Sequence, residues 1–181
     1  MPQASAESWN WVSHLSPLDE SKLHPETMQA MSESGWTPDR CIAVDAPLGE
    51  LEQMGFTFAP YVRAVIANMY GLKIEPASEE GGEFGNYEPL IIRPEIIRRH
   101  RSVAEFIDAE LGGTFAPIGL WLSSSYVFLE SGGRAVGYLD GLIWQLGESF
   151  EAALNLMVRA DKPLECVYVR PGRRPWPPPR P

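Results

Sequence analysis

Carboxylates gather in and beside one glycine-rich segment of the chain, residues 76–89. They belong to Glu75, Glu79, Glu80, Glu83 and Glu88. A loop that holds several carboxylates can offer them to the Lys and Arg side chains of a protein partner. A solvated loop without a partner is the alternative interpretation. The same glutamates would repel phosphate, so the glycines of this segment do not predict a nucleotide site.

Other reactive side chains lack the neighbours that catalysis or metal binding requires. Residues 123–125 are three serines without the Gly-x-Ser-x-Gly frame of a nucleophile. The histidines His14, His24 and His100 show no pairing at a metal-ligand spacing, and no cysteine lies near them in the sequence. The sequence therefore predicts no enzyme, no metal and no cofactor.

The two cysteines, Cys41 and Cys166, match no disulfide framework. Two thiols in a chain of 181 residues indicate a reducing compartment, and a single bridge between them is the alternative. Cys41 follows Arg40, a neighbour that can activate a thiol. We interpret Cys41 instead as a small, buried strand residue.

The charge of the chain is unevenly distributed. The net charge is -9 at pH 7, and residues 1–90 carry 14 acidic and 4 basic side chains, a net charge of -10. Residues 91–181 carry 10 acidic and 11 basic side chains, a net charge of +1. Solubility explains such an excess, and a surface that meets a basic partner is the alternative. Because an acidic protein repels nucleic acids, we expect no direct nucleic-acid partner and interpret Arg98 to Arg101 as a solvated helix start.

The start of the chain and its hydropathy indicate a cytoplasmic location. Residues 1–8 hold no basic side chain and no apolar run, so they do not predict a signal peptide. No stretch is long and apolar enough to span a membrane. We therefore expect a cytoplasmic protein without a membrane partner.

Hydrophobic spacing and end signals predict mainly helices early in the chain and mainly strands later. Helices are expected from Pro25 to Gly35, Asp45 to Gly55, Pro60 to Gly71, Ser102 to Gly112 and from Ser149 onward. Strands are expected at Cys41–Val44, Leu72–Glu75, Leu90–Ile92, Pro117–Leu122, Ser125–Glu130, Arg134–Leu139 and Leu164–Val169. Asp45 and Ser102 are expected to cap their helices, Ser102 within a capping box that ends at Glu105. This order predicts an α+β domain with a mostly antiparallel sheet flanked by helices.

The composition divides the chain into three parts. Residues 1–22 are expected to be a loosely ordered lead-in, 23–169 the folded domain, and 170–181 a disordered tail rich in Pro and Arg. The six prolines within residues 171–181 exclude a helix or a central strand there. Residues 175–180 have the composition of a polyproline ligand, and a disordered extension is the interpretation we prefer.

Several short pieces follow one another in an order that resembles a known family. Gly35-Trp36-Thr37-Pro38-Asp39-Arg40 follows the first helix, and Tyr70-Gly71-Leu72 ends a later one. Ala116-Pro117-Ile118-Gly119 comes next, before the hairpin around Gly132-Gly133 and the helix that Gly147-Glu148-Ser149 opens. The series is similar to the third subfamily of SUKH immunity proteins and covers residues 23–160. The residues that carry the motif are Gly35, Trp36, Pro38, Arg40, Gly71, Pro117 and Gly119.

The resemblance implies an α+β fold and a function. It implies a cytoplasmic immunity protein that binds and neutralises a toxin domain, often a nuclease or a deaminase. Such a toxin needs a basic surface for its substrate, which an acidic inhibitor would suit, and the five glutamates are the candidate contacts. A scaffold of the same fold that docks a non-toxin partner is the alternative. Within the motif, we expect Trp36 to pack the first helix against the sheet and Arg40 to pair with a carboxylate.

Overall fold

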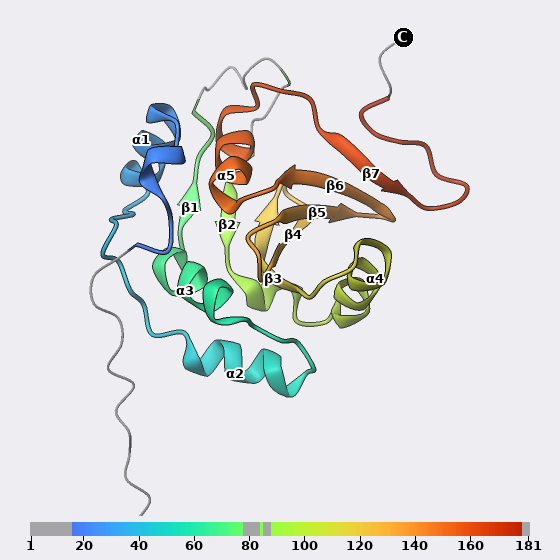
Figure 1. Cartoon of the computed structure of the whole chain (residues 1–181), viewed down its shortest axis with the longest axis horizontal. Helices are drawn as coiled ribbons and strands as arrows, with labels where there is room; N and C mark the ends of the chain where they lie inside the picture. Colours follow the sequence, from blue (N-terminus) through green and yellow to red (C-terminus); the bar gives the residue numbers. More distant parts are fainter. Residues whose placement is uncertain (1–15, 78–83, 85–87, 179–181) are drawn as a thin grey trace, which may run out of the picture.

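Seven strands form one antiparallel sheet whose spatial order follows the sequence order (Figure 1). The computed structural model describes residues 16–77, 84 and 88–178. The strands are β1 (Lys73–Ile74), β2 (Leu90–Ile92), β3 (Phe115–Trp121), β4 (Ser125–Glu130), β5 (Ala135–Leu139), β6 (Leu142–Gly147) and β7 (Glu165–Val169). Each strand pairs with the next one along the chain, so β1 and β7 are the edges of the sheet.

Five α-helices and two short 3-10 helices in the described residues surround this sheet. They are η1 (Glu20–Lys22), α1 (Pro25–Glu33), α2 (Asp45–Gln53), α3 (Pro60–Met69), η2 (Pro94–Ile97), α4 (Arg101–Leu111) and α5 (Phe150–Arg159). The predicted α+β class and antiparallel sheet are thus confirmed.

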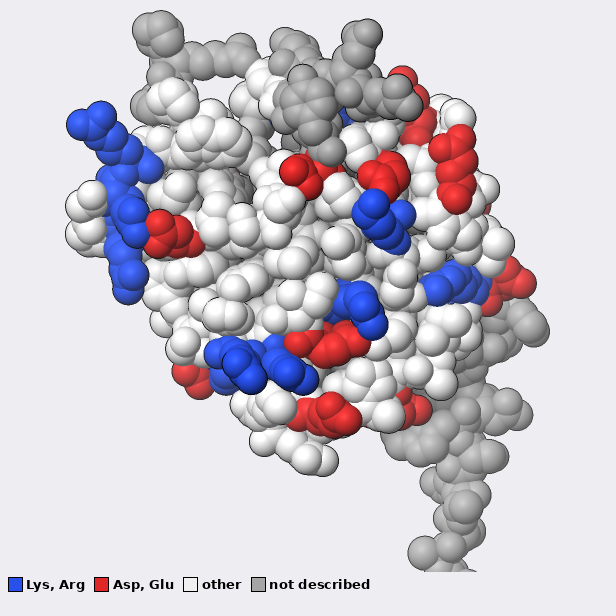
Figure 2. Space-filling view, turned by 180° about the vertical axis from the view of Figure 1, so that it is seen from behind, with Lys and Arg blue, Asp and Glu red and all other residues white. Residues whose placement is uncertain are grey.

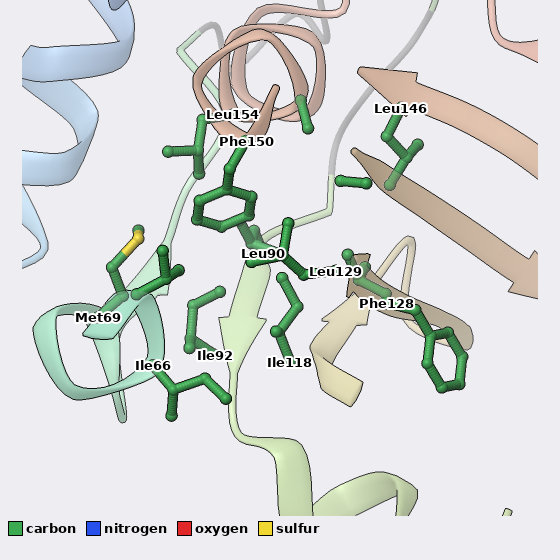
Figure 3. Close-up of a cluster of buried hydrophobic side chains, with 14 of the residues drawn as sticks. Ile66, Met69, Leu90, Ile92, Ile118, Phe128, Leu129, Leu146, Phe150 and Leu154 are labelled. Carbon is green, nitrogen blue, oxygen red and sulfur yellow. The ribbon is translucent and has the colours of Figure 1, made fainter. Parts of the chain in front are cut away.

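The two faces of the sheet are covered by different helices. Ile66 of α3 and Leu154 of α5 point toward the same core as Ile92 and Leu129 of the sheet (Figure 3). Phe128 points away from this core because neighbouring residues of a strand face opposite sides. On the side opposite the α3–α5 core, the ring of Phe106 in α4 lies 5.1 Å from the ring of Tyr168 in β7.

A close backbone contact explains one motif glycine. An added Cβ at Gly119 would lie 1.8 Å from the carbonyl oxygen of Ile91 on the neighbouring strand β2. The register of β3 against β4 shifts between Pro117 and Gly119, as at a β-bulge. Any larger side chain would therefore push β2 away from β3.

One strand was not predicted, although the sequence contains its signal. Strand β6 follows β5 through Asp140 and Gly141, both of which have positive φ angles, 50° and 86°. An Asp-Gly pair between two apolar runs is a strong signal for a tight β-hairpin. The prediction instead left residues 140–148 without an element.

Four local predictions are wrong. Residues 41–44 form no strand, because the backbone N–H of Ile42 donates to the end of α3, at the carbonyl of Ala67 (2.9 Å), and not to another strand. Cys41 is exposed rather than buried. Asp45 is the first residue of α2 instead of its cap. Ser102 lies inside the first turn of α4, because η2 leads almost directly into that helix and His100 precedes it. No side-chain hydrogen bond caps either helix start.

Residues on either side of the predicted domain also contact it. The backbone N–H of Asp19 donates to the carboxylate of Glu151 (2.9 Å), and Leu18 is buried. At the other end, the backbone N–H of Arg170 donates to the carbonyl of Gly141 (2.9 Å). The boundaries after residues 22 and 169 stay predictions.

Candidate functional site

An acidic groove lies between helix α1 and the edge strand β1. Its volume is about 190 Å³, and we call it the α1–β1 groove. It is lined by Glu26, Gln29, Ala30, Glu33, Ser34, Lys73, Glu75, Pro76 and Ala77. Three carboxylates and a single amine therefore border the groove.

The two elements bring these side chains together by their own periodicities. Positions 26, 29, 30 and 33 are spaced at one helical turn or its multiples, so they share one face of α1. In β1 the side chain of Ile74 is buried, whereas Lys73 and Glu75, the residue that follows the strand, are exposed on its other side. The groove thus depends on α1 lying beside an edge strand.

The carboxylates of the groove differ in their partners. Glu26 accepts a hydrogen bond from Arg159 of α5 (2.9 Å), and this bond holds the pKa of Glu26 below its usual value. Glu75 pairs with Lys73 (2.5 Å) in an exposed contact. Glu33 accepts a hydrogen bond from the amide of Gln29 (2.9 Å), and among the described residues no Lys or Arg pairs with it. Glu33 is therefore the groove carboxylate that is not neutralised from within the described chain.

Charges on another part of the surface are interleaved. Figure 2 shows the molecule from behind, where acidic side chains mostly lie next to basic ones. Ion pairs on the surface of the described chain include Arg93 with Glu95 (3.9 Å) and Arg101 with Glu105 (3.6 Å).

The predicted contact residues fall in different places. Glu75 lines the α1–β1 groove. Glu88 is half-buried and accepts a hydrogen bond from the hydroxyl of Ser123 (2.5 Å), at the turn between β3 and β4. Glu79, Glu80 and Glu83 lie outside the described residues.

Glu26 and Glu33 were not predicted as contact residues. Their spacing of seven residues on an acidic helix face was the available signal. What the spacing could not reveal is the position of Glu75 on the opposite wall of the same groove.

The first family motif forms a hydrogen-bonded junction with the end of α3. The buried amide of Asn68 accepts from the indole N–H of Trp36 (2.6 Å) and donates to the carbonyl of Arg40 (2.8 Å). The guanidinium of Arg40 donates to the carbonyls of Asn68 (2.8 Å) and Tyr70 (2.7 Å). The expected carboxylate partner is thus replaced by carbonyls, because the last carbonyls of a helix lack intrahelical donors and attract a cation.

Two motif glycines end the helices that this junction connects. Gly35 follows α1 with a φ angle of 90°, and Gly71 follows α3 with 79°. This left-handed region is accessible to glycine at little cost. The predicted helix ends at these two residues match the structure closely.

The described part of the chain shows no arrangement for metal binding or membrane spanning. In residues 16–77, 84 and 88–178, no group of three or more His, Cys, Asp or Glu side chains could hold a metal ion. Among the helices described, none combines the length and the apolar character needed to cross a bilayer.

Residues 23–160 match the model of a protein family described as SUKH-3 immunity protein. The match includes the Trp36–Asn68 junction, Gly119 and both helices that contact the sheet through Ile66 and Leu154. No curated protein and no solved structure matches the chain.

Proposed function

Because the chain belongs to the SUKH-3 immunity protein family, we propose that it binds a cognate toxin domain and neutralises it by protein–protein interaction. The proposed toxin is a nuclease or a deaminase with a basic surface for its nucleic-acid substrate. The proposed location is the cytoplasm, where such a toxin would act. The chain itself does no catalysis in this proposal.

The charge of the α1–β1 groove is the observation that supports this proposal, because it offers a contact surface for a basic partner. Glu33 has no basic partner in the described chain, and Glu75 is more than half exposed in its pair with Lys73. Exposed ion pairs contribute little to stability. A Lys or Arg of a partner can therefore replace Lys73 as the ion-pair partner of Glu75 with little loss of free energy. Complementary charges of this kind mainly accelerate association and select the partner.

The first residues of the glutamate-rich segment, Pro76 and Ala77, line the same groove. Ala77 directly precedes residue 78, where the undescribed segment begins. We propose Glu75, Glu79, Glu80 and Glu83 as contacts together with Glu26 and Glu33. Glu88 remains a proposed contact of lower exposure, because it already bonds Ser123.

The test is a growth rescue in a host cell. A toxin domain encoded beside this gene is expressed alone, with the wild-type chain, or with the variant Glu33→Lys/Glu75→Lys. We expect the toxin to stop growth, the wild type to restore it and to co-purify with the toxin, and the variant to lose both effects.

A matched variant separates the groove from total charge. Glu50 and Glu110 are exposed acids on α2 and α4, and Glu50→Lys/Glu110→Lys changes the net charge by the same amount. This control should still rescue growth. Rescue by the groove variant would exclude the groove as the contact, whereas failure of the wild type would favour the non-toxin scaffold.

A further inference from the structure

After β7 the Pro-rich C-terminal segment turns back (Figure 1) and contacts strand β6 and the β5–β6 turn. After β7, the chain turns at Gly172, whose φ angle is 86°, and the backbone N–H of Arg173 donates to the carbonyl of Arg170 (2.9 Å). The guanidinium of Arg173 then pairs with Asp140 of the β5–β6 turn (2.5 Å). These contacts direct residues 174–178 back over the sheet.

Trp144 of β6 is the centre of the contact. Its side chain is only 2% exposed, and a buried indole N–H requires an acceptor. The acceptor is the backbone carbonyl of Trp176, at 2.5 Å. The two indole rings lie 6.1 Å apart with an interplanar angle of 78°, an edge-to-face arrangement.

Cys166 of β7 faces the same side of the sheet as Trp144, its partner in the strand register. The Cys166 thiol is half-buried and donates a hydrogen bond to the backbone carbonyl of Tyr168 (3.2 Å), and the backbone of Trp176 also lies within hydrogen-bonding reach of it. Burial raises the pKa of this thiol and so keeps it protonated. Residue 176 therefore lies beside both Trp144 and Cys166.

The contact joins the family domain to a segment outside it. The match to the family ends at residue 160, so Trp144 lies within it and Trp176 beyond it. Proline-rich segments are commonly bound by aromatic side chains of a partner domain. Here the aromatic residue Trp144 and the proline-rich segment that it contacts belong to one chain, since Pro175 and Pro177 flank Trp176.

We propose that the sheet end around Trp144 and Cys166 is a binding site for a proline-rich segment that contains Trp-Pro, occupied in the resting protein by residues 173–178 of the same chain. The occupant is displaceable. Trp176 is 53% exposed, and the Arg173–Asp140 pair is exposed on both sides and contributes little. A proline-rich segment of another protein must compete with a tethered ligand, whose effective concentration is in the millimolar range.

The first measurement is the reactivity of Cys166 in the full chain. Cys41 is exposed and would dominate the signal, so all variants carry Cys41→Ser. We expect Trp176→Ala to speed the labelling of Cys166 roughly fivefold, because the edge-to-face ring contact that holds residue 176 beside Trp144 is lost. The matched control is Arg174→Ala, at an exposed residue of the same segment, which should leave the rate unchanged. An unchanged rate in Trp176→Ala would overturn the proposal.

The second measurement supplies the segment in trans. A synthetic peptide with the sequence of residues 173–178 is titrated into the full-length Trp176→Ala chain, and the indole N–H resonance of Trp144 is followed by NMR. We expect saturable binding in the millimolar range, weaker binding to the wild type, and none for a peptide with Ala in place of Trp. Equal binding to the wild type and to Trp176→Ala, or no binding to either, would contradict the proposal that residues 173–178 occupy the site and can be displaced from it.

A variant of Trp144 completes the test. Trp144→Phe keeps an aromatic ring but has no N–H to donate, and it should reduce peptide binding at least about fivefold. Thermal unfolding of Trp144→Phe shows whether the domain remains folded. None of these outcomes depends on toxin binding, so the two proposals can fail separately.

Discussion

The indole N–H of Trp36 donates a hydrogen bond of 2.6 Å to the side-chain oxygen of Asn68, and both side chains are buried. The two residues are 32 positions apart, one after α1 and one at the end of α3. The amide of Asn68 also donates to carbonyls of the segment that follows Trp36, at Pro38 (3.2 Å) and Arg40 (2.8 Å). A single amide therefore joins an irregular segment, which makes no strand, to a helix end.

Removing this amide should destabilise the protein strongly. We expect Asn68→Leu to lower the free energy of unfolding by about 2–4 kcal/mol, because it leaves a buried indole N–H and several carbonyls without partners. Urea denaturation of the full chain measures the change. The exposed residue Gln53 supplies the control, since Gln53→Ala should alter stability by less than about 0.5 kcal/mol. Equal stabilities of the two variants would contradict a structural role for the junction.

Two glycines should respond in opposite directions to the same substitution. At Gly119 the new methyl group would meet the Ile91 carbonyl at 1.8 Å, so Gly119→Ala should cost about 3 kcal/mol or more and separate β2 from β3. At Gly49 of helix α2 an added Cβ would meet no atom within 4 Å outside the adjoining backbone of its own helix, so Gly49→Ala should stabilise by about 0.5–1 kcal/mol. Thermal unfolding of both variants tests the pair, and a stable Gly119→Ala protein would show that the strands tolerate a side chain there.

The groove proposal predicts a specific dependence on salt. If the carboxylates of the α1–β1 groove steer a basic toxin, Glu33→Lys/Glu75→Lys should mainly slow association, by about tenfold or more at low ionic strength. The difference from the wild type should shrink as salt screens the charges. Surface plasmon resonance over a salt series measures both effects. A change confined to the dissociation rate would point to packing rather than charge.

The phenol of Tyr61 predicts a loss of stability in base. Burial, and secondarily the charge of Glu151, raises the pKa of Tyr61 from its usual value of 10.0 to about 12. The unfolded chain therefore loses this proton first, so the stabilisation is complete below pH 10 and is lost between about pH 10 and 12.

Denaturation at a series of pH values tests this sign. Tyr61→Phe should unfold with a weaker dependence on pH above 10 than the wild type, whereas the two should follow the same profile between pH 6 and 9. If the wild type and Tyr61→Phe lose stability equally above pH 10, a group other than Tyr61 causes the loss.

Local signals in the sequence were sufficient for several elements. Pro25 and Pro60 do begin helices, Ser149 does cap α5 by accepting from the backbone N–H of Ala152 (3.2 Å), and residues 90–92 do form a strand. Each of these depends on a residue's own backbone preference or on neighbours within one turn, which is information the sequence contains directly.

Contacts between distant segments decided the rest. Residues 41–44 have the composition of a strand but have no neighbouring strand to pair with, since the backbone N–H of Ile42 reaches only α3. Likewise, Ser102 could cap a helix, but η2 leads the chain into α4 at Arg101, so Ser102 lies inside the first turn of that helix.

The candidate site shows the same division. The sequence by itself determined an acidic first half, a glutamate-rich loop and the family motif. Only the tertiary structure placed Glu33 and Glu75 on opposite walls of one groove, and only it put Trp176 over Trp144. Composition sets the charge of each segment, but which charges meet depends on how α1 packs beside an edge strand. That packing comes from burial of apolar faces distributed over the whole chain.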